Sequence, residues 1–142
     1  QLELLGHGSV VTIDIDEVPG RPTHPRITHL TGSSSDPAVA EQVREMLPTD
    51  GSPVVVVLDS DHSRDHVLAE MRLLGPMVTE GSLMIVEDTN INGHPVFAEF
   101  GPGPWEAVEE FLRETDAFEV DESYERYYIT QNPRGYLRRV TR

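Results

Sequence analysis

The sequence predicts an α/β protein with a Rossmann-like parallel sheet and helices on both of its faces. Short apolar runs alternate along the chain with segments in which apolar residues recur at helical spacing. The clearest run, PVVVVLD at 53–59, has no polar residue between Pro53 and its final Asp59. Continuous Val and Leu runs of this kind are typical of parallel strands, because helices cover both faces of a parallel sheet.

The first third of the chain is expected to form two strands and a helix. SVVTIDID at 9–16 and ITHLTG at 27–32 are the strands. The helix is expected over 33–47, with Asp36 as its N-cap and Pro37 at its first position. Both residue types favour these positions, since a carboxylate accepts from free amides and proline lacks one.

The remainder of the chain repeats this alternation and then closes with two strands, which we expect to be an antiparallel pair. A long loop rich in Gly and Pro, at 89–104, interrupts it and is a candidate lid. The expected elements are a strand at 53–59, a helix around Val67–Leu74 that ends at Gly75-Pro76, a strand at 82–88, a helix at 105–114, and strands at 118–121 and 126–132.

Composition limits the classes of function. The 142 residues fit one domain over 1–142, and the absence of cysteine excludes disulfides and thiolate metal sites. The formal net charge is −14, and all eleven basic residues are arginines, which disfavours nucleic acid or an anionic membrane as a partner. No apolar run reaches the ~20 residues of a membrane span, and no signal peptide opens the sequence, so we expect a cytoplasmic protein.

Three of the expected strands end in acidic residues. Right-handed crossovers bring the carboxyl ends of parallel strands to one edge, which is where such sheets bind ligands. The sharpest group is Asp59, Glu87 and Asp88, because carboxylate oxygens are the ligands that hard divalent cations prefer. Solvated acids that cap helix N-termini explain the spacing equally well, so the residues alone leave both interpretations open.

Three further features carry chemistry. His62, three residues after Asp59, has a side chain that titrates near neutrality and suits a general base, although a surface or capping role is the commoner one. Asp14 ends the first strand and can accept from the hydroxyls of a cofactor ribose, or simply form a turn. GSSSD at 32–36 offers a glycine for close approach and hydroxyls for an adenine edge, or only a helix N-terminus.

Three segments carry a family resemblance: LDSDHSRDHVLAEM, IVEDTNINGHPV and GPGPWEAVEEFL. The chain resembles, from about Gly6 to Arg139, the cephalosporin hydroxylase family, also described as rhamnosyl O-methyltransferases. The resemblance implies the class I S-adenosylmethionine methyltransferase fold and a magnesium-dependent O-methyltransferase related to the catechol type. A hydroxyl of a sugar or small natural product, as in antibiotic biosynthesis, would then be the acceptor. Homo-oligomerisation stays open.

The resemblance also assigns roles to the acids that follow the strands at 53–59 and 82–88. Asp59 matches the first metal-ligand acid, and Glu87 and Asp88 match the adjacent acidic pair that ligates the Mg²⁺. His62 matches the histidine proposed as general base in related sugar O-methyltransferases. Asp61 could replace Asp59 as the ligand if the strand end is shifted, and this is the lesser option.

The S-adenosylmethionine site is assigned in the same way. Asp14 matches the acid that holds the cofactor ribose. Ser33 and Ser34, next to Gly32, fall where the family contacts the adenine.

The sequence departs from the family at its start. Family members carry a strand and a Gly-rich loop before the segment that corresponds to Gln1, and the loop cradles the methionine part of the cofactor. We therefore expect the chain to be a fragment of a longer protein, or the gap to be filled by another chain or a rearranged pairing. An inactive binding module is the first alternative. An iron and 2-oxoglutarate hydroxylase is a weaker one, since His62-Ser63-Arg64-Asp65 has the wrong spacing.

Overall fold

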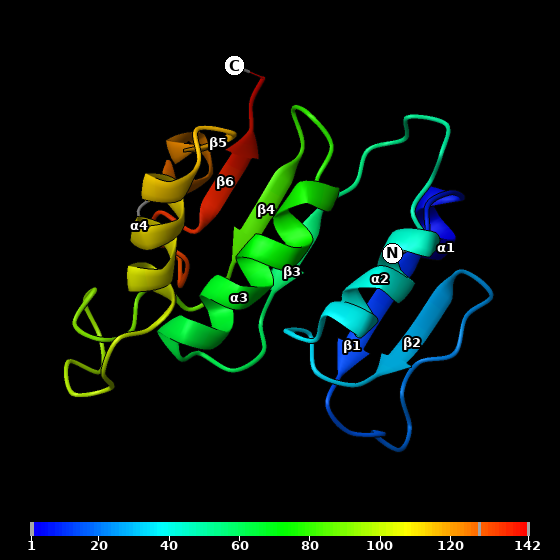
Figure 1. The fold of residues 1–142 in the computed structure, drawn as a ribbon, viewed down its shortest axis with the longest axis horizontal. Helices are drawn as coiled ribbons and strands as arrows, with labels where there is room; N and C mark the ends of the chain where they lie inside the picture. The colour runs from blue at the N-terminus through cyan, green and yellow to red at the C-terminus, as the bar shows by residue number, and fades with distance from the viewer. Residues whose placement is uncertain (1, 128, 142) are drawn as a thin grey trace. The chain divides into compact units, whose positions relative to one another are not determined.

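The computed structural model describes residues 2–127 and 129–141 and divides the chain into two compact units (Figure 1). The first unit is Gln1–Glu45 and the second is Met46–Arg142. The described strands form two separate sheets, one of two strands and one of four. The expectation of one methyltransferase-like domain over 1–142 stays a prediction.

The first unit contains a parallel pair of strands and two helices. Its strands, β1 (Val10–Asp14) and β2 (Ile27–Thr31), pair in register from Val10 opposite Ile27 to Asp14 opposite Thr31. Both expected strands are therefore confirmed, and their carboxyl ends lie at the same edge. The helices are α1 (Leu2–Leu5) and α2 (Pro37–Glu45).

The start of α2 follows from its capping residues. Asp36 Oδ1 accepts a hydrogen bond from the amide of Ala38 at 2.8 Å, and Pro37 is the first helical residue, as the sequence predicts. Residues 33–36, which the expected segment also includes, lie before the helix, because the Asp36 amide donates to Ser33 O at 3.0 Å and closes a turn there. Gly32 precedes this turn with φ of 150°, and a Cβ there would lie 2.8 Å from Val39 Cγ2.

The second unit is a mixed sheet with strand order β3-β4-β6-β5. β4 pairs in parallel with β3 and antiparallel with β6, and β6 pairs antiparallel with β5. In chain order the elements are β3 (Val56–Leu58), α3 (Arg64–Leu74), the 3₁₀ turn η1 (Gly75–Met77), β4 (Leu83–Val86), α4 (Pro104–Glu114), β5 (Phe118–Val120), the 3₁₀ turn η2 (Glu122–Glu125) and β6 (Tyr136–Arg139).

The last strand is not where the sequence predicts it. The segment 126–132 forms no strand among its described residues, with Tyr128 outside them, and the antiparallel partner of β5 is β6 instead. The two arginines of β6 give this segment a polar composition, so the sequence pattern does not predict a strand there. Arg138 Nε donates to Asp121 Oδ2 at 2.8 Å, and Arg139 Nη1 donates to the carbonyls of Pro76 and Val78 at 2.8 and 2.7 Å. Both guanidinium groups thus have hydrogen-bond acceptors, although β6 lies between β4 and β5 in the sheet.

The core of the second unit lies between its sheet and two helices. α3 and α4 contact one another, and Figure 1 shows both in front of the four strands. Among the residues that the structure describes, no helix is long and apolar enough to span a bilayer. The residues that are less than 2% exposed include Met71, Met84, Val86, Val108 and Leu137.

Truncating Met84 tests this core. Met84 is 0% exposed in β4, so Met84→Ala leaves a cavity between sheet and helices and should lower the free energy of unfolding by about 2–5 kcal/mol. Met46, which is 45% exposed, gives the matched control, and Met46→Ala should change it by less than about 0.5 kcal/mol. Urea denaturation measures both, and equal losses would contradict the packing described.

Candidate functional site

Parallel pairing of β3 and β4 places two acidic strand ends side by side. Leu58 is the register partner of Val86, and the following amide, of Glu87, donates to Leu58 O at 2.9 Å. Asp59 and Glu87 are the next residues of the two strands and therefore lie at one edge of the sheet. The expectation of a common edge is confirmed for β3 and β4, whereas β1, which ends at Asp14, belongs to a separate two-stranded sheet.

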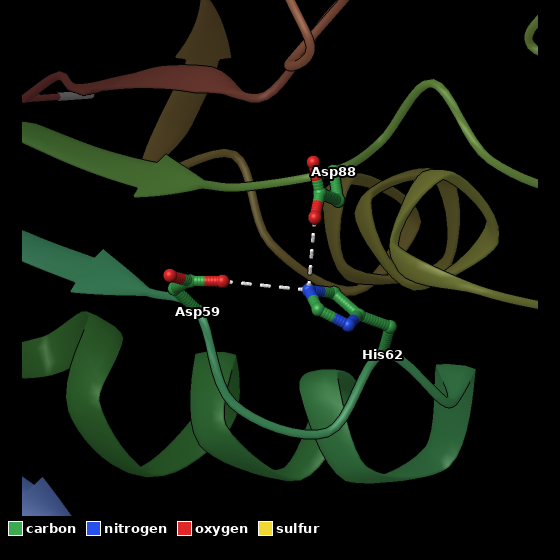
Figure 2. Close-up of side chains that lie close together, drawn as sticks. All are labelled: Asp59, His62 and Asp88. Carbon is green, nitrogen blue, oxygen red and sulfur yellow. Dashed lines mark ion pairs between the residues drawn. The ribbon is translucent and has the colours of Figure 1, made fainter.

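A cluster of three side chains occupies this edge. His62 Nε2 lies 3.5 Å from Asp59 Oδ1 and 3.4 Å from Asp88 Oδ2. The three candidate ligand atoms all lie within 4.8 Å of one another. Figure 2 shows the imidazole between the two carboxylates, with Asp59 at the end of β3, His62 before α3 and Asp88 after β4. Three segments of the chain thus converge on one point.

His62 Nε2 is the unusual atom of this cluster. It is buried and has no hydrogen-bond partner, since both carboxylates lie beyond the 3.2 Å of a normal N–H···O bond. A buried polar atom without a partner is destabilising, so such atoms are rare unless a ligand or ion satisfies them. The missing hydrogen bond at Nε2 therefore marks His62 as a candidate functional residue.

Asp88 is held by a turn that comes from 44 residues further along the chain. Its amide donates to Asn132 Oδ1 at 2.9 Å, and the next residue, Thr89, donates from Oγ1 to Pro133 O at 2.7 Å. The backbone of this turn lies so close to β4 that a Cβ on Gly135 would be 2.2 Å from Val86 O. Sequence reasoning missed Asn132, although its Asn-Pro dipeptide marks a turn.

The environment of Glu87 raises the pKa of its carboxyl. Burial is the largest cause that raises the pKa of Glu87 above its usual 4.5, and the charges of Asp59 and Asp88 raise it further. The nearby His62 lowers the pKa of Glu87 in part. Glu87 is not a member of the three-residue cluster, but its carboxyl is close enough to interact electrostatically with all three members.

Asp61 has a different task. Its Oδ1 accepts from the amide of Ser63 at 2.7 Å, and this hydrogen bonding lowers the pKa of Asp61. The carboxylate therefore closes the turn that leads into α3, and it lies outside the Asp59–His62–Asp88 cluster. The geometry favours Asp59 over Asp61 as the acid of this edge.

The loop that follows Asp88 is fastened to the start of α4. Glu106 Oε1 accepts from Asn92 Nδ2 at 2.9 Å and lies 3.0 Å from His94 Nε2, while Glu106 Oε2 accepts from the amide of Gly103 at 2.7 Å. Burial alone would raise the pKa of Glu106, but these hydrogen bonds outweigh it and lower the pKa. The His94 ring also stacks on Trp105 at 4.3 Å between centroids.

The four predicted cofactor residues lie together at the edge of the first unit. Asp14 ends β1, and its carbonyl accepts from the amide of Gly32, which follows β2, at 2.8 Å. Ser33 Oγ lies 2.9 Å from a neighbouring hydroxyl, that of Ser35. Asp14 Oδ2 also pairs with Arg21 Nη2 at 3.1 Å. The Asp14 carboxylate is thus paired with a guanidinium that the sequence did not predict.

Comparison with known proteins identifies the family. The model of the family described as rhamnosyl O-methyltransferase/CmcI matches residues 2–140, so the chain belongs to this family. The rhamnosyl O-methyltransferase of Mycobacterium tuberculosis H37Rv is 44% identical over 115 residues, which are 80% of this chain and 47% of that protein. The Mycobacterium leprae enzyme of the same name is 44% identical over 74% of this chain. The chain spans about half the length of these curated relatives.

Solved structures give the same fold. MycE methyltransferase from the mycinamycin biosynthetic pathway, in complex with Mg, S-adenosylhomocysteine (SAH) and mycinamycin VI, matches 75% of this chain and 28% of its own with a TM-score of 0.53 and 24% identity. A second crystal form of MycE, with Mg and SAH, matches 89% of this chain and 30% of its own with a TM-score of 0.54 and 21% identity. The Rossmann-like methyltransferase fold predicted from the sequence is confirmed.

The raised pKa of Glu87 predicts a pH-dependent stability. Because the folded pKa lies above the unfolded value, ionised Glu87 destabilises the metal-free chain, and this loss develops as pH rises from about 4.5 through the folded pKa. Glu87→Gln should therefore raise the free energy of unfolding at pH 7 and should give no such gain at pH 3. Denaturation at the two pH values measures this, with Glu119→Gln, an exposed position, as control. An equal gain at both pH values would contradict it.

Proposed function

We propose that this chain is part of an S-adenosylmethionine- and Mg²⁺-dependent O-methyltransferase that acts on a sugar hydroxyl. The observation that carries the proposal is the convergence of two strand-end carboxylates on a buried imidazole nitrogen that has no hydrogen-bond partner. Membership of the rhamnosyl O-methyltransferase/CmcI family supports the reaction type and the sugar acceptor. The Mg and SAH of the MycE complexes support the cofactors.

The donor set suits a hard cation. Asp59 and Asp88 provide carboxylate oxygens from two strand ends, and Glu87 adds a third carboxyl whose ionisation a cation would favour. Bound Mg²⁺ would lower the pKa of a coordinated acceptor hydroxyl and orient its oxygen. We assign His62 to the proton rather than to the metal, since imidazole is a ligand better suited to Zn²⁺, Cu²⁺ or iron.

Each residue group has its own part in the proposed reaction. S-adenosylmethionine would supply a sulfonium methyl, whose transfer to the hydroxyl oxygen yields a methyl ether, SAH and one proton. His62 Nε2 would accept that proton, and Asp59 and Asp88, at 3.5 and 3.4 Å, would stabilise the imidazolium that forms. Asp14 would accept from the cofactor ribose, with Gly32, Ser33 and Ser34 beside it.

Two alternatives remain to be separated from this proposal. The Asp59–His62–Asp88 cluster contains one imidazole, whereas the iron oxygenase triad uses two histidines and one carboxylate, so the hydroxylase is disfavoured. An inactive binding module is consistent with the fold alone. It differs from an enzyme in needing neither the cation nor the base.

Metal binding is the first test, and the backbone at Asp88 decides which variant to use. Asp88 has φ of 52°, a conformation that asparagine tolerates and alanine does not, so Asp88→Asn removes the charge without new strain. Together with Asp59→Asn it should abolish Mn²⁺ binding measured by calorimetry or electron paramagnetic resonance. The control is Asp65→Asn, whose carboxylate is 82% exposed and pairs with Arg64. Unchanged binding in the double variant would exclude this metal site.

Methyl transfer tests the role of His62. With labelled S-adenosylmethionine and p-nitrophenyl α-L-rhamnoside as acceptor, His62→Gln should lower kcat by about 10²–10⁴-fold, because the base is lost. Mn²⁺ affinity should stay within about threefold, since the carboxylates remain. The measurement uses this chain together with any coding sequence that adjoins it. Full turnover in His62→Gln would exclude His62 as the general base. Loss of Mn²⁺ binding in this variant would show that His62 is a metal ligand.

A further inference from the structure

Glu70 is a buried acid that the proposed reaction does not use. It lies two turns into α3 and is 2% exposed, although acidic side chains are almost never buried to this extent without a partner. Glu70 and Thr89 are the buried polar side chains among residues 2–127 and 129–141. Thr89 belongs to the support of Asp88, which leaves the burial of Glu70 to be explained.

The contacts of Glu70 are lopsided. Its Oε1 accepts a hydrogen bond from the Ser60 hydroxyl at 2.7 Å. His66 Nε2 lies 3.6 Å from the same oxygen, beyond the length of a direct hydrogen bond. The second oxygen, Oε2, is buried and has no hydrogen-bond partner. Oε1 thus has one hydrogen bond and a longer ion pair with His66, whereas Oε2 has no hydrogen bond.

This arrangement opposes folding rather than favouring it. Leaving a buried oxygen without a partner costs its desolvation free energy, and an apolar side chain of similar size would avoid that cost. Ser60 itself is exposed, so its hydroxyl would bond to water if Glu70 were absent. The pair is thus poorly explained as a device for stability, and its geometry points to another purpose.

The position of Ser60 in the chain suggests a role for the Ser60–Glu70 hydrogen bond. Ser60 follows Asp59 and lies in the five-residue turn, Asp59–Ser63, that also carries His62. Asp61 closes the far end of this turn through the Ser63 amide at 2.7 Å, whereas Glu70 reaches its near end from inside the unit. The Ser60–Glu70 hydrogen bond therefore ties the start of this turn to a side chain buried in the core.

We propose that Glu70 is a positioning residue, which holds the Asp59–Ser63 turn through Ser60 in the shape that presents Asp59 and His62 to the site. The inference rests on the proposed function for its consequence in metal binding. Its structural part, the order of the turn, stands apart from any metal. The two parts can be measured separately.

Three variants and a control test the anchor. Glu70→Met removes the acceptor at similar volume, Ser60→Ala removes the donor at an exposed position, and Glu70→Gln keeps an oxygen that can accept. Glu119→Gln, on the exposed side of β5, controls for loss of a negative charge. For each variant, ¹⁵N relaxation of the metal-free chain gives the order parameters of the turn amides, and calorimetry gives the Mn²⁺ dissociation constant.

We expect Glu70→Met and Ser60→Ala to lower the order parameters of residues 60–62 from about 0.85 to below about 0.6, with α3 unchanged. Mn²⁺ should bind about tenfold more weakly in both, as for other partners that orient metal ligands. Glu70→Gln and Glu119→Gln should behave like the unmodified chain. Thermal unfolding should show Glu70→Met at least as stable as the unmodified chain; if it does not fold, Ser60→Ala alone decides.

Several results would overturn the anchor. Unchanged order of the turn in Ser60→Ala and Glu70→Met would do so, as would a turn loosened as far by Glu70→Gln as by Glu70→Met. Failure of the unmodified chain to bind Mn²⁺, together with a loosened turn in Ser60→Ala, would count against the proposed metal site and would support the anchor.

Discussion

The parallel pairing of β3 with β4 is the constraint on which the candidate site depends. Three register pairs, from Val56 opposite Met84 to Leu58 opposite Val86, bring the carboxyl ends of both strands to the same level. Antiparallel pairing would have sent one acid to each end of the sheet. A slip of one residue would have turned its side chains to the opposite face. The apolar strands thus determine where the charges meet, although they take no part in the chemistry.

Polar contacts from outside the sheet complete what the strands begin. Asn132 fixes the backbone of Asp88, Glu106 gathers the loop that follows it, and Glu70 contacts the turn after β3. All three side chains come from elements that follow or flank the two strands and use short, directional hydrogen bonds. Strand pairing alone would leave the acids on loops that could move independently. Carboxylates of like charge repel one another, so these hydrogen bonds are needed to hold them close together.

The sequence predicts most of the acids at the carboxyl ends of β3 and β4, but few of the polar contacts that hold them. Val54–Leu58 and Leu83–Val86 could be recognised as strands because both are apolar throughout, and the acids follow directly. The final strand was misplaced, since Arg138 and Arg139 look exposed, whereas RYYITQN has the composition of a strand. Contacts such as Asn132 to Asp88 join residues 44 positions apart. No local pattern encodes them, because they depend on how a turn packs after the sheet has formed.

The left-handed backbone at Asp88 has a consequence for how this family can diverge. A non-glycine residue at φ of 52° stores conformational energy, of the order of 1 kcal/mol, that the surrounding hydrogen bonds must offset. Glycine and asparagine are the residues that adopt this conformation most readily. Where the carboxylate is replaced, the backbone at this position therefore favours glycine or asparagine over other residues.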